Sequence, residues 1–219
     1  NIKLIHVSTD YVFNGSSNLP YREEDIAKPV TVYGKTKLQG ENSLLKSNPD
    51  SLIIRTSWLY SPYGKNFLKT MLRLGSERDE LIVVFDQIGT PTFSGHLADA
   101  IIHAINIYYQ ENKWMNGIYH FSNQGVCSWY DFAYEIMKKK QINCNIKAVT
   151  SDKFPTPAKR PAYSVLNKTA FENDFNLAWG ATFLIITSQD TPELLDQMLN
   201  YREKGYNIKI ILVGEKALH

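Results

Sequence analysis

The stretch "HVSTDYVFNG", residues 6–15, carries the pattern that decides the fold. It overlaps the end of a short apolar run that begins at Ile2, so residues 2–7 are predicted to form a buried strand. Polar side chains, among them Thr9 and Asp10, gather where this strand ends. Polar groups at the end of a buried strand usually face a crevice. We therefore expect a binding site near the start of this sequence.

Outward from this stretch, apolar strands alternate with amphipathic helices. Such alternation indicates βαβ units and a mostly parallel sheet, and therefore an α/β fold. In the predicted helix 65–77 we expect Gly75 to act as the C-terminal stop, and we expect Ser128 to cap a later helix. The predicted strands are 51–60, 81–85, 117–123, 181–187 and 208–214, and the predicted helices are 33–45, 65–77, 94–110, 128–140 and 191–205.

The composition limits the classes of function. The chain has 219 residues, is 43% hydrophobic and carries a net charge of +2 with interleaved signs, so no nucleic-acid or membrane-surface partner is expected. No apolar run approaches the roughly 20 residues of a membrane span, and no signal peptide is visible. Cys127 and Cys144 fit no metal or redox spacing, which favours free thiols and a cytoplasmic protein. The five histidines have no metal-ligand spacing either, so no metal is predicted.

The pattern of the sequence changes near Trp179 and Gly180. Residues 180–219 have the pattern of one complete βαβ unit, with a strand, a helix that begins after Thr191, and a second strand. We therefore predict two parts, residues 1–179 and a tail of uncertain origin over residues 180–219.

Tyr33 and Lys37 are the first candidates for chemistry. Four residues apart on a helix, they share one face. A nearby ammonium stabilises a phenolate, so a tyrosine in this setting can exchange a proton with a ketone oxygen. A hydroxyl at the end of a neighbouring strand, from Thr9 or Ser8, could hold the same oxygen. The combination suits a nicotinamide-dependent carbonyl reductase, although Tyr-x-x-x-Lys also arises easily by chance.

Six segments, taken in order, resemble one family. They are "STDYVFNG", "YGKTKLQGE", "RTSWLY", "DQIGTPT", "GIYHFSN" and "PAKRPAYSVLNK", spread from about residue 1 to about residue 175. Together they resemble the extended short-chain dehydrogenase/reductase group, and specifically the dTDP-4-dehydrorhamnose reductase family. The resemblance implies NADPH- or NADH-dependent reduction of a dTDP-4-keto-6-deoxy sugar, in a partial Rossmann-like parallel sheet with a small substrate-domain portion.

The resemblance also implies roles for particular residues. Thr9, Tyr33 and Lys37 match the catalytic set of the family, and Tyr33 and Lys37 match positions that reach the cofactor, the lysine binding the nicotinamide ribose. Asp10, Tyr11 and Trp58 match positions that line the sugar-nucleotide pocket of the family. Arg160 matches the substrate-domain loop and could bind the diphosphate, because a guanidinium can donate two parallel hydrogen bonds to phosphate oxygens.

Each of these assignments has a structural alternative. Trp58 and Tyr11 could be core aromatics, and Asp10 could be a turn residue that binds its own backbone. Arg160, next to Pro161, could be a solvated loop charge. The segment 86–92 could be only a turn made by glycine and proline, although in the family it borders the substrate cleft.

The sequence lacks one part of such a reductase. A Rossmann reductase holds the cofactor pyrophosphate on a Gly-rich turn at a helix N-terminus, and this sequence contains no such turn. Since the first residue is Asn1 and not Met, we expect a truncated, chimeric or incompletely recorded chain that is inactive by itself. We also expect an exposed sheet edge, covered by residues 180–219 or by self-association. The rival interpretation is a non-catalytic sugar-nucleotide-binding or interaction module.

Overall fold

The computed structural model describes residues 2–154, 160–175, 182–187, 191, 194, 196 and 207–212. The chain divides into two compact units, Asn1–Ala170 and Phe171–His219. The boundary predicted between residues 179 and 180 from the change in sequence pattern stays a prediction. Both units contain parallel strands, which agrees with the predicted α/β class.

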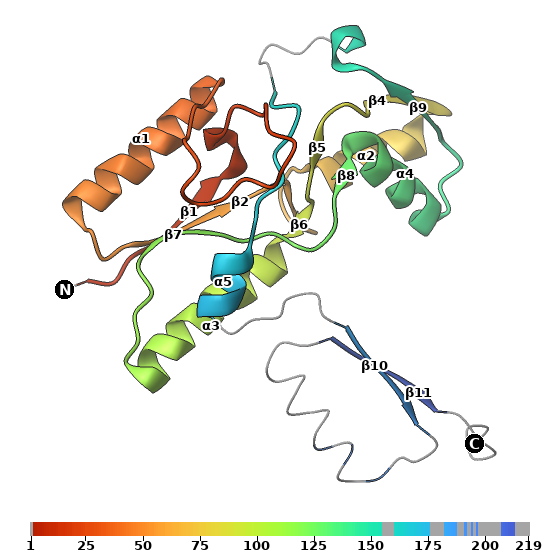
Figure 1. Ribbon diagram of the computed structural model, residues 1–219. Helices are drawn as coiled ribbons and strands as arrows, with labels where there is room; N and C mark the ends of the chain where they lie inside the picture. The colour runs from red at the N-terminus through yellow and green to blue at the C-terminus, as the bar shows by residue number, and fades with distance from the viewer. Residues whose placement is uncertain are drawn as a thin grey trace. The chain divides into compact units, whose positions relative to one another are not determined.

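The first unit is built around a three-stranded parallel sheet with the order β1-β2-β7. The register places Ser8, Arg55 and His120 in one row across the three strands. Figure 1 shows α1 and α3 on opposite sides of this sheet. The strands and helices predicted for this region are confirmed, with ends that differ by a few residues. Their observed bounds are β1 Ile5–Thr9, α1 Val32–Ser47, β2 Leu52–Thr56, α3 Ser94–Glu111 and β7 Gly117–His120.

A second layer in the same unit has its own small sheet. Strand β4 (Glu80–Val84) pairs in parallel with β9 (Asn145–Val149), and helices α2 (Phe67–Glu77) and α4 (Trp129–Lys140) pack on this pair. The predicted strand 81–85 thus exists, but it belongs to this separate pair of strands. Strand β9 was not predicted from the sequence. The core here is made of Met71, Leu81, Val83, Ala133, Ile136, Met137 and Ile146.

Short pairs of strands join the two layers around the ends of β2 and α4. Strand β3 pairs with β6, and β5 pairs with β8. None of these two-residue strands was predicted as a separate element. The remaining elements of this unit and its boundary are η1 Asp10–Val12, β3 Leu59–Tyr60, β5 Ile88–Gly89, β6 Thr92–Phe93, β8 Cys127–Ser128, η2 Ser151–Lys153 and α5 Thr169–Asp174.

Two helix ends were predicted from single residues, with different outcomes. Ser128 caps α4 as predicted, through a reciprocal capping box with Asp131. The prediction for Gly75 was wrong, because α2 continues to Glu77. Gly75 is buried, and a Cβ there would lie 2.5 Å from Met137 Sδ. This glycine therefore serves close helix packing instead of helix termination.

The second unit contains two of the predicted strands. Strands β10 (Thr182–Thr187) and β11 (Asn207–Leu212) pair in parallel, as a βαβ unit requires. Most of the predicted helix 191–205 lies outside the described residues. At its start, the Leu194 amide donates to Thr191 Oγ1 at 3.3 Å, which is the contact expected of an N-cap.

Candidate active site

A polar cavity of about 240 Å³ lies at the carboxyl ends of β1 and β2. Strand β1 leads into it through Thr9, and β2 through Thr56, since the two residues are register partners. Six of the seven predicted site residues line the cavity. These six are Thr9, Asp10, Tyr11, Tyr33, Trp58 and Arg160. Lys37 does not line it.

Thr9 is held at the rim by two contacts. Its hydroxyl donates to Asp10 Oδ1 at 3.0 Å and accepts from the Tyr11 amide at 3.2 Å, so it also caps the short helix η1. The side chain is almost fully buried, which limits its rotation. A threonine hydroxyl has one donor and two acceptor positions, so an incoming carbonyl oxygen would compete with Asp10 for its proton.

Tyr33 and Lys37 come from the first two turns of α1. The helix begins where Thr31 Oγ1 accepts from the Gly34 amide at 2.9 Å. Tyr33 is 54% exposed and meets Tyr11 edge to face, with ring centroids 5.8 Å apart. Lys37 Nζ turns toward β1, where it donates to the Val7 carbonyl at 2.8 Å and lies 3.4 Å from His6 Nε2.

Asp10 is the acidic residue among those that line the cavity, and 2% of its surface is exposed. Burial raises the pKa of its carboxyl group to about 7, against the opposing effect of the hydroxyls of Ser164 and Thr9. Asp10 also begins η1, and its carbonyl accepts from the Phe13 amide. It therefore combines the turn role with a place in the cavity wall, where both protonation states are accessible near neutral pH.

Tyr11 and Arg160 lie together although they are far apart in the sequence. Burial and the Asp10 carboxylate raise the pKa of the Tyr11 phenol, and the Arg160 guanidinium opposes that rise. Arg160 is exposed and lines the cavity, so its charge is available to an anionic ligand. A guanidinium presents several N–H groups in a fork that matches phosphate oxygens.

Trp58 occupies a constrained position at the end of β2. Its backbone has φ 45°, a left-handed conformation that is uncommon outside glycine. The indole packs against Gly89, where a Cβ would lie 2.4 Å from Trp58 Cε2. The segment 86–92 therefore does more than turn the chain, because its glycine makes room for the indole that lines the cavity.

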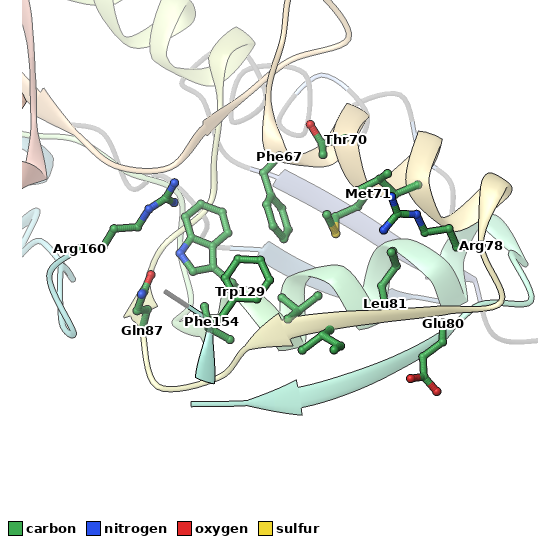
Figure 2. A pocket seen from close by; sticks show the side chains of 14 residues that line it. Phe67, Thr70, Met71, Arg78, Glu80, Leu81, Gln87, Trp129, Phe154 and Arg160 are labelled. Atoms are coloured by element: carbon green, nitrogen blue, oxygen red, sulfur yellow. The ribbon is translucent and has the colours of Figure 1, made fainter. Parts of the chain in front are cut away.

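A second, apolar cavity of about 500 Å³ adjoins the polar one. Trp129 and Arg160 line both, so they mark the junction between the two. Figure 2 shows the rings of Phe67 and Trp129 side by side, with Arg160 beyond Trp129 and with Met71 and Leu81 on the side of Phe67. This wall was not predicted from the sequence, since α2, β4 and α4 each contribute apolar residues that look like ordinary core residues.

The two cavities can receive different parts of one ligand. The apolar part suits a flat ring, the arginine at the junction suits a phosphate, and the hydroxyl-rich part suits a polar group such as a sugar. In the part of the chain that the structure describes, no three His, Cys, Asp or Glu residues are placed to hold a metal ion. Both cysteines are free, as predicted, and no described helix is long and apolar enough to cross a membrane.

The parallel sheet with helices on both sides, and the cavity at the ends of its strands, define a Rossmann-like α/β protein with the short-chain dehydrogenase/reductase fold. The chain belongs to the RmlD substrate binding domain family, whose model matches residues 1–181. The predicted family is thereby confirmed. Fold-level similarity extends to a dTDP-glucose 4,6-dehydratase of Bacillus anthracis, with 18% identity and a TM-score of 0.65.

Two relatives illustrate the similarity in sequence. The chain is 47% identical over 168 residues to the spore coat polysaccharide biosynthesis protein SpsK of Bacillus subtilis, covering 77% of this chain and 57% of that protein. It is 45% identical over 183 residues to dTDP-4-dehydrorhamnose reductase of Aggregatibacter actinomycetemcomitans, covering 81% and 62%. The chain thus spans about 60% of the length of such relatives.

Solved structures of dTDP-4-dehydrorhamnose reductases are similar to this chain in both fold and sequence. A dTDP-4-dehydrorhamnose reductase from Clostridium acetobutylicum has a TM-score of 0.70 and 45% identity, over 76% of this chain and 57% of that chain. The Bacillus anthracis enzyme, solved in complex with NADP, has a TM-score of 0.71 and 39% identity, over 78% and 59%. The similarity therefore covers most of the present chain and little more than half of each enzyme.

Proposed function

We propose that this chain forms the substrate-binding and proton-donating part of an NADPH- or NADH-dependent dTDP-4-dehydrorhamnose reductase. The reaction reduces the 4-keto group of dTDP-4-dehydro-6-deoxy-L-mannose and yields dTDP-L-rhamnose. One observation carries the proposal: Thr9 and Tyr33, far apart in sequence, line the same cavity as Arg160 and Trp58. Relatives that are 43–45% identical bear the name dTDP-4-dehydrorhamnose reductase, which supports the same substrate.

Tyr33 is the proton donor in this proposal. A bound nicotinamide would supply the hydride that reduces the keto carbon, and the electron pair of the broken C=O π bond would remain on oxygen. The Tyr33 hydroxyl gives its proton to that oxygen and leaves a phenolate. Thr9 holds the same oxygen by turning its hydroxyl proton away from Asp10 Oδ1. The ammonium of Lys37, one helical turn further along α1, would stabilise the phenolate until a proton from solvent restores the hydroxyl.

The chain's own residues fit one end of a nicotinamide cofactor. An ammonium has three N–H donors, and Lys37 uses at most two of them on the Val7 carbonyl and the His6 ring. The third is left for a hydroxyl of the nicotinamide ribose, the group that Tyr33 and Lys37 would hold. The pyrophosphate needs a Gly-rich turn, and these 219 residues contain none.

The substrate would lie across both cavities. The keto-sugar would sit beside Thr9 and Tyr33, the diphosphate would meet Arg160, and the thymine ring would enter the apolar cavity and lie against the wall that Phe67 and Trp129 form. The sugar end needs polar contacts and the base needs a flat apolar wall, so the two halves of the site match the two halves of the ligand.

A turnover assay tests the proposal on the complete natural polypeptide that carries these residues. Purified protein is mixed with enzymatically prepared dTDP-4-dehydrorhamnose and NADPH or NADH, the loss of reduced cofactor is followed, and the product is identified by mass spectrometry. Saturable formation of dTDP-rhamnose is the expected result. Sugar-nucleotide binding without any turnover would instead support the rival binding module. The cytoplasmic location and self-association stay predictions.

A further inference from the structure

Helix α1, which carries Tyr33 and Lys37, packs on the protein through the half-buried Leu38, Leu44 and Leu45 and through one fully buried polar side chain. Only Gly34 and Glu41 of its 16 residues are buried, and Glu41 is completely so. A helix of a globular protein usually packs through an apolar stripe. In α1 this stripe is only half-buried, so the fully buried side chain of Glu41 makes the most specific contacts of the helix.

The contacts of Glu41 are the most specific of these. Its carboxylate accepts from Arg55 Nε at 3.1 and 3.2 Å and from Arg55 Nη2 at 2.7 Å, and the Ser8 hydroxyl donates to it as well. The side chains of the ion pair are 1% and 3% exposed. The next residue in the row, His120, does not compete for this carboxylate as a cation, because burial and the Arg55 charge lower its pKa to about 3.

This buried cluster of Ser8, Glu41 and Arg55 touches every element that carries the proposed chemistry. Glu41 lies one helical turn beyond Lys37 and about two turns beyond Tyr33 on the same face. Ser8 directly precedes Thr9 in β1. Arg55 lies over the ring of Phe13, at 5.2 Å from its centroid, in the segment that follows Thr9.

We propose that Ser8, Glu41 and Arg55 are positioning residues that fix α1 on β1 and β2, so that Tyr33 and Lys37 meet the group held by Thr9. The inference rests on the proposed function and adds to it an effect on turnover of Glu41 and Arg55, which do not line the polar cavity. Stability alone does not require such a pair, because well-packed apolar residues often replace a buried ion pair without loss. Bidentate geometry restricts the helix in translation and rotation, which an apolar contact does not.

The decisive variant replaces the pair by apolar residues of similar size, Glu41→Leu with Arg55→Met. This avoids the unpaired buried charge of a single substitution, so the protein should fold with a melting temperature close to that of the wild type. In the complete natural polypeptide we expect kcat to fall at least about tenfold, since a misplacement of about 1 Å can cost 10²-fold, with Kd for dTDP-rhamnose changed less than about twofold. The matched control is Glu77→Leu with Arg73→Met, an exposed Glu–Arg pair on α2 that should leave both values unchanged.

Several outcomes would overturn the inference. A double variant that folds and keeps wild-type kcat would show that the cluster is only structural. If that variant does not fold, Arg55→Lys decides, because it keeps the positive charge and loses the bidentate hydrogen bonds to Glu41. Then kcat should fall a few-fold with Kd unchanged, and an unchanged kcat counts against the inference. If the wild type itself shows no turnover, the proposed function has failed. Amide hydrogen exchange of the double variant then tests the positioning role. An exchange rate that rises relative to the wild type more in α1 than in β2 supports the role, and an equal rise in both elements refutes it.

Discussion

The indole rings of Trp58 and Trp129 stack face to face, with centroids 3.5 Å apart and planes inclined by 5°. One ring follows β2 and the other begins α4, so the stack joins the three-stranded sheet to the smaller layer. Phe67 extends the aromatic surface, at 4.5 Å from the Trp129 ring. Both tryptophans line the polar cavity, and Trp129 lines the apolar one as well. This stack therefore gives the proposed ligand one continuous wall.

Ligand binding should depend on this wall and on Arg160. We expect dTDP-rhamnose to raise the melting temperature even without nicotinamide, because a ligand that binds only the folded state stabilises it. Trp58→Ala and Arg160→Ala should each weaken that shift, measured against the melting temperature of the same variant without ligand. Tyr109→Ala, at a residue that is 78% exposed and does not line either cavity, serves as the control. If dTDP-rhamnose raises the melting temperature of both cavity variants as much as that of the wild type, the binding site lies elsewhere.

Turnover should depend on the hydroxyl of Tyr33. In the complete polypeptide, Tyr33→Phe should lower kcat by roughly 10²-fold or more, the scale of a lost general acid. Binding of dTDP-rhamnose should barely change, since the ring is half exposed and keeps its edge-to-face contact with Tyr11. Stopped-flow and steady-state kinetics measure the effect, with Tyr109→Phe as the control. Wild-type turnover in the phenylalanine variant would remove Tyr33 from the mechanism.

Two glycines on α1 should respond to alanine in opposite ways. At Gly34 a Cβ would lie 2.1 Å from the Tyr11 carbonyl oxygen, which is backbone and cannot easily move. We expect Gly34→Ala to destabilise the fold by about 1–3 kcal/mol, as overpacking does, and to lower turnover by displacing Tyr33. At Gly40 a Cβ would meet no neighbouring atom within 4 Å, so Gly40→Ala should stabilise by about 0.5–1 kcal/mol through helix propensity. Urea unfolding compares the two, and equal effects would contradict the close contact.

The carboxyl of Asp10 should make stability depend on pH. Its pKa is about 7 in the folded protein and near 3.8 when unfolded, so the folded state binds more protons between these values. Stability therefore falls as pH rises through this window, by up to roughly 4 kcal/mol from this group. Asp10→Asn should consequently gain stability relative to the wild type between pH 4 and pH 8, as measured by urea unfolding. The exposed Asp99→Asn is the control. A constant difference across this pH range would mean that Asp10 ionises normally.

The 219-residue polypeptide by itself should not use the cofactor. Its residues reach only the nicotinamide ribose, and most of the binding free energy of a dinucleotide comes from the pyrophosphate site. We expect no saturable NADPH-dependent reduction and no measurable NADPH binding by calorimetry, although dTDP-rhamnose should still bind. Saturable turnover by a monomer of this polypeptide would reveal a dinucleotide site in residues that the structure does not describe.

The elements of the first unit were predictable where local signals agreed with the fold. Ser128 and Asp131 have the spacing of a capping box, and the polar end of β1 indicated the cavity. Gly75 misled because a glycine near a helix end has the same local signal whether it stops the helix or admits a neighbour. The neighbour, Met137, comes from a distant helix, and no local pattern announces it.

The apolar half of the site was not predictable for a related reason. Phe67, Leu81 and Trp129 occupy ordinary core positions of an amphipathic helix, a strand and a second helix. Whether such a residue faces the core or a cavity depends on how far the three elements separate, which side-chain periodicity does not encode. Glu41 shows the converse, because a charged helix residue is ordinarily exposed and here is fully enclosed.

The enclosed ion pair of Glu41 and Arg55 also constrains how this sequence can diverge. Losing either charge alone leaves its partner desolvated inside the protein, which is strongly destabilising. Replacing both together by apolar residues removes that penalty. The two positions should therefore covary, so that related sequences carry both charges or neither. The exposed positions of α1 should vary independently of one another.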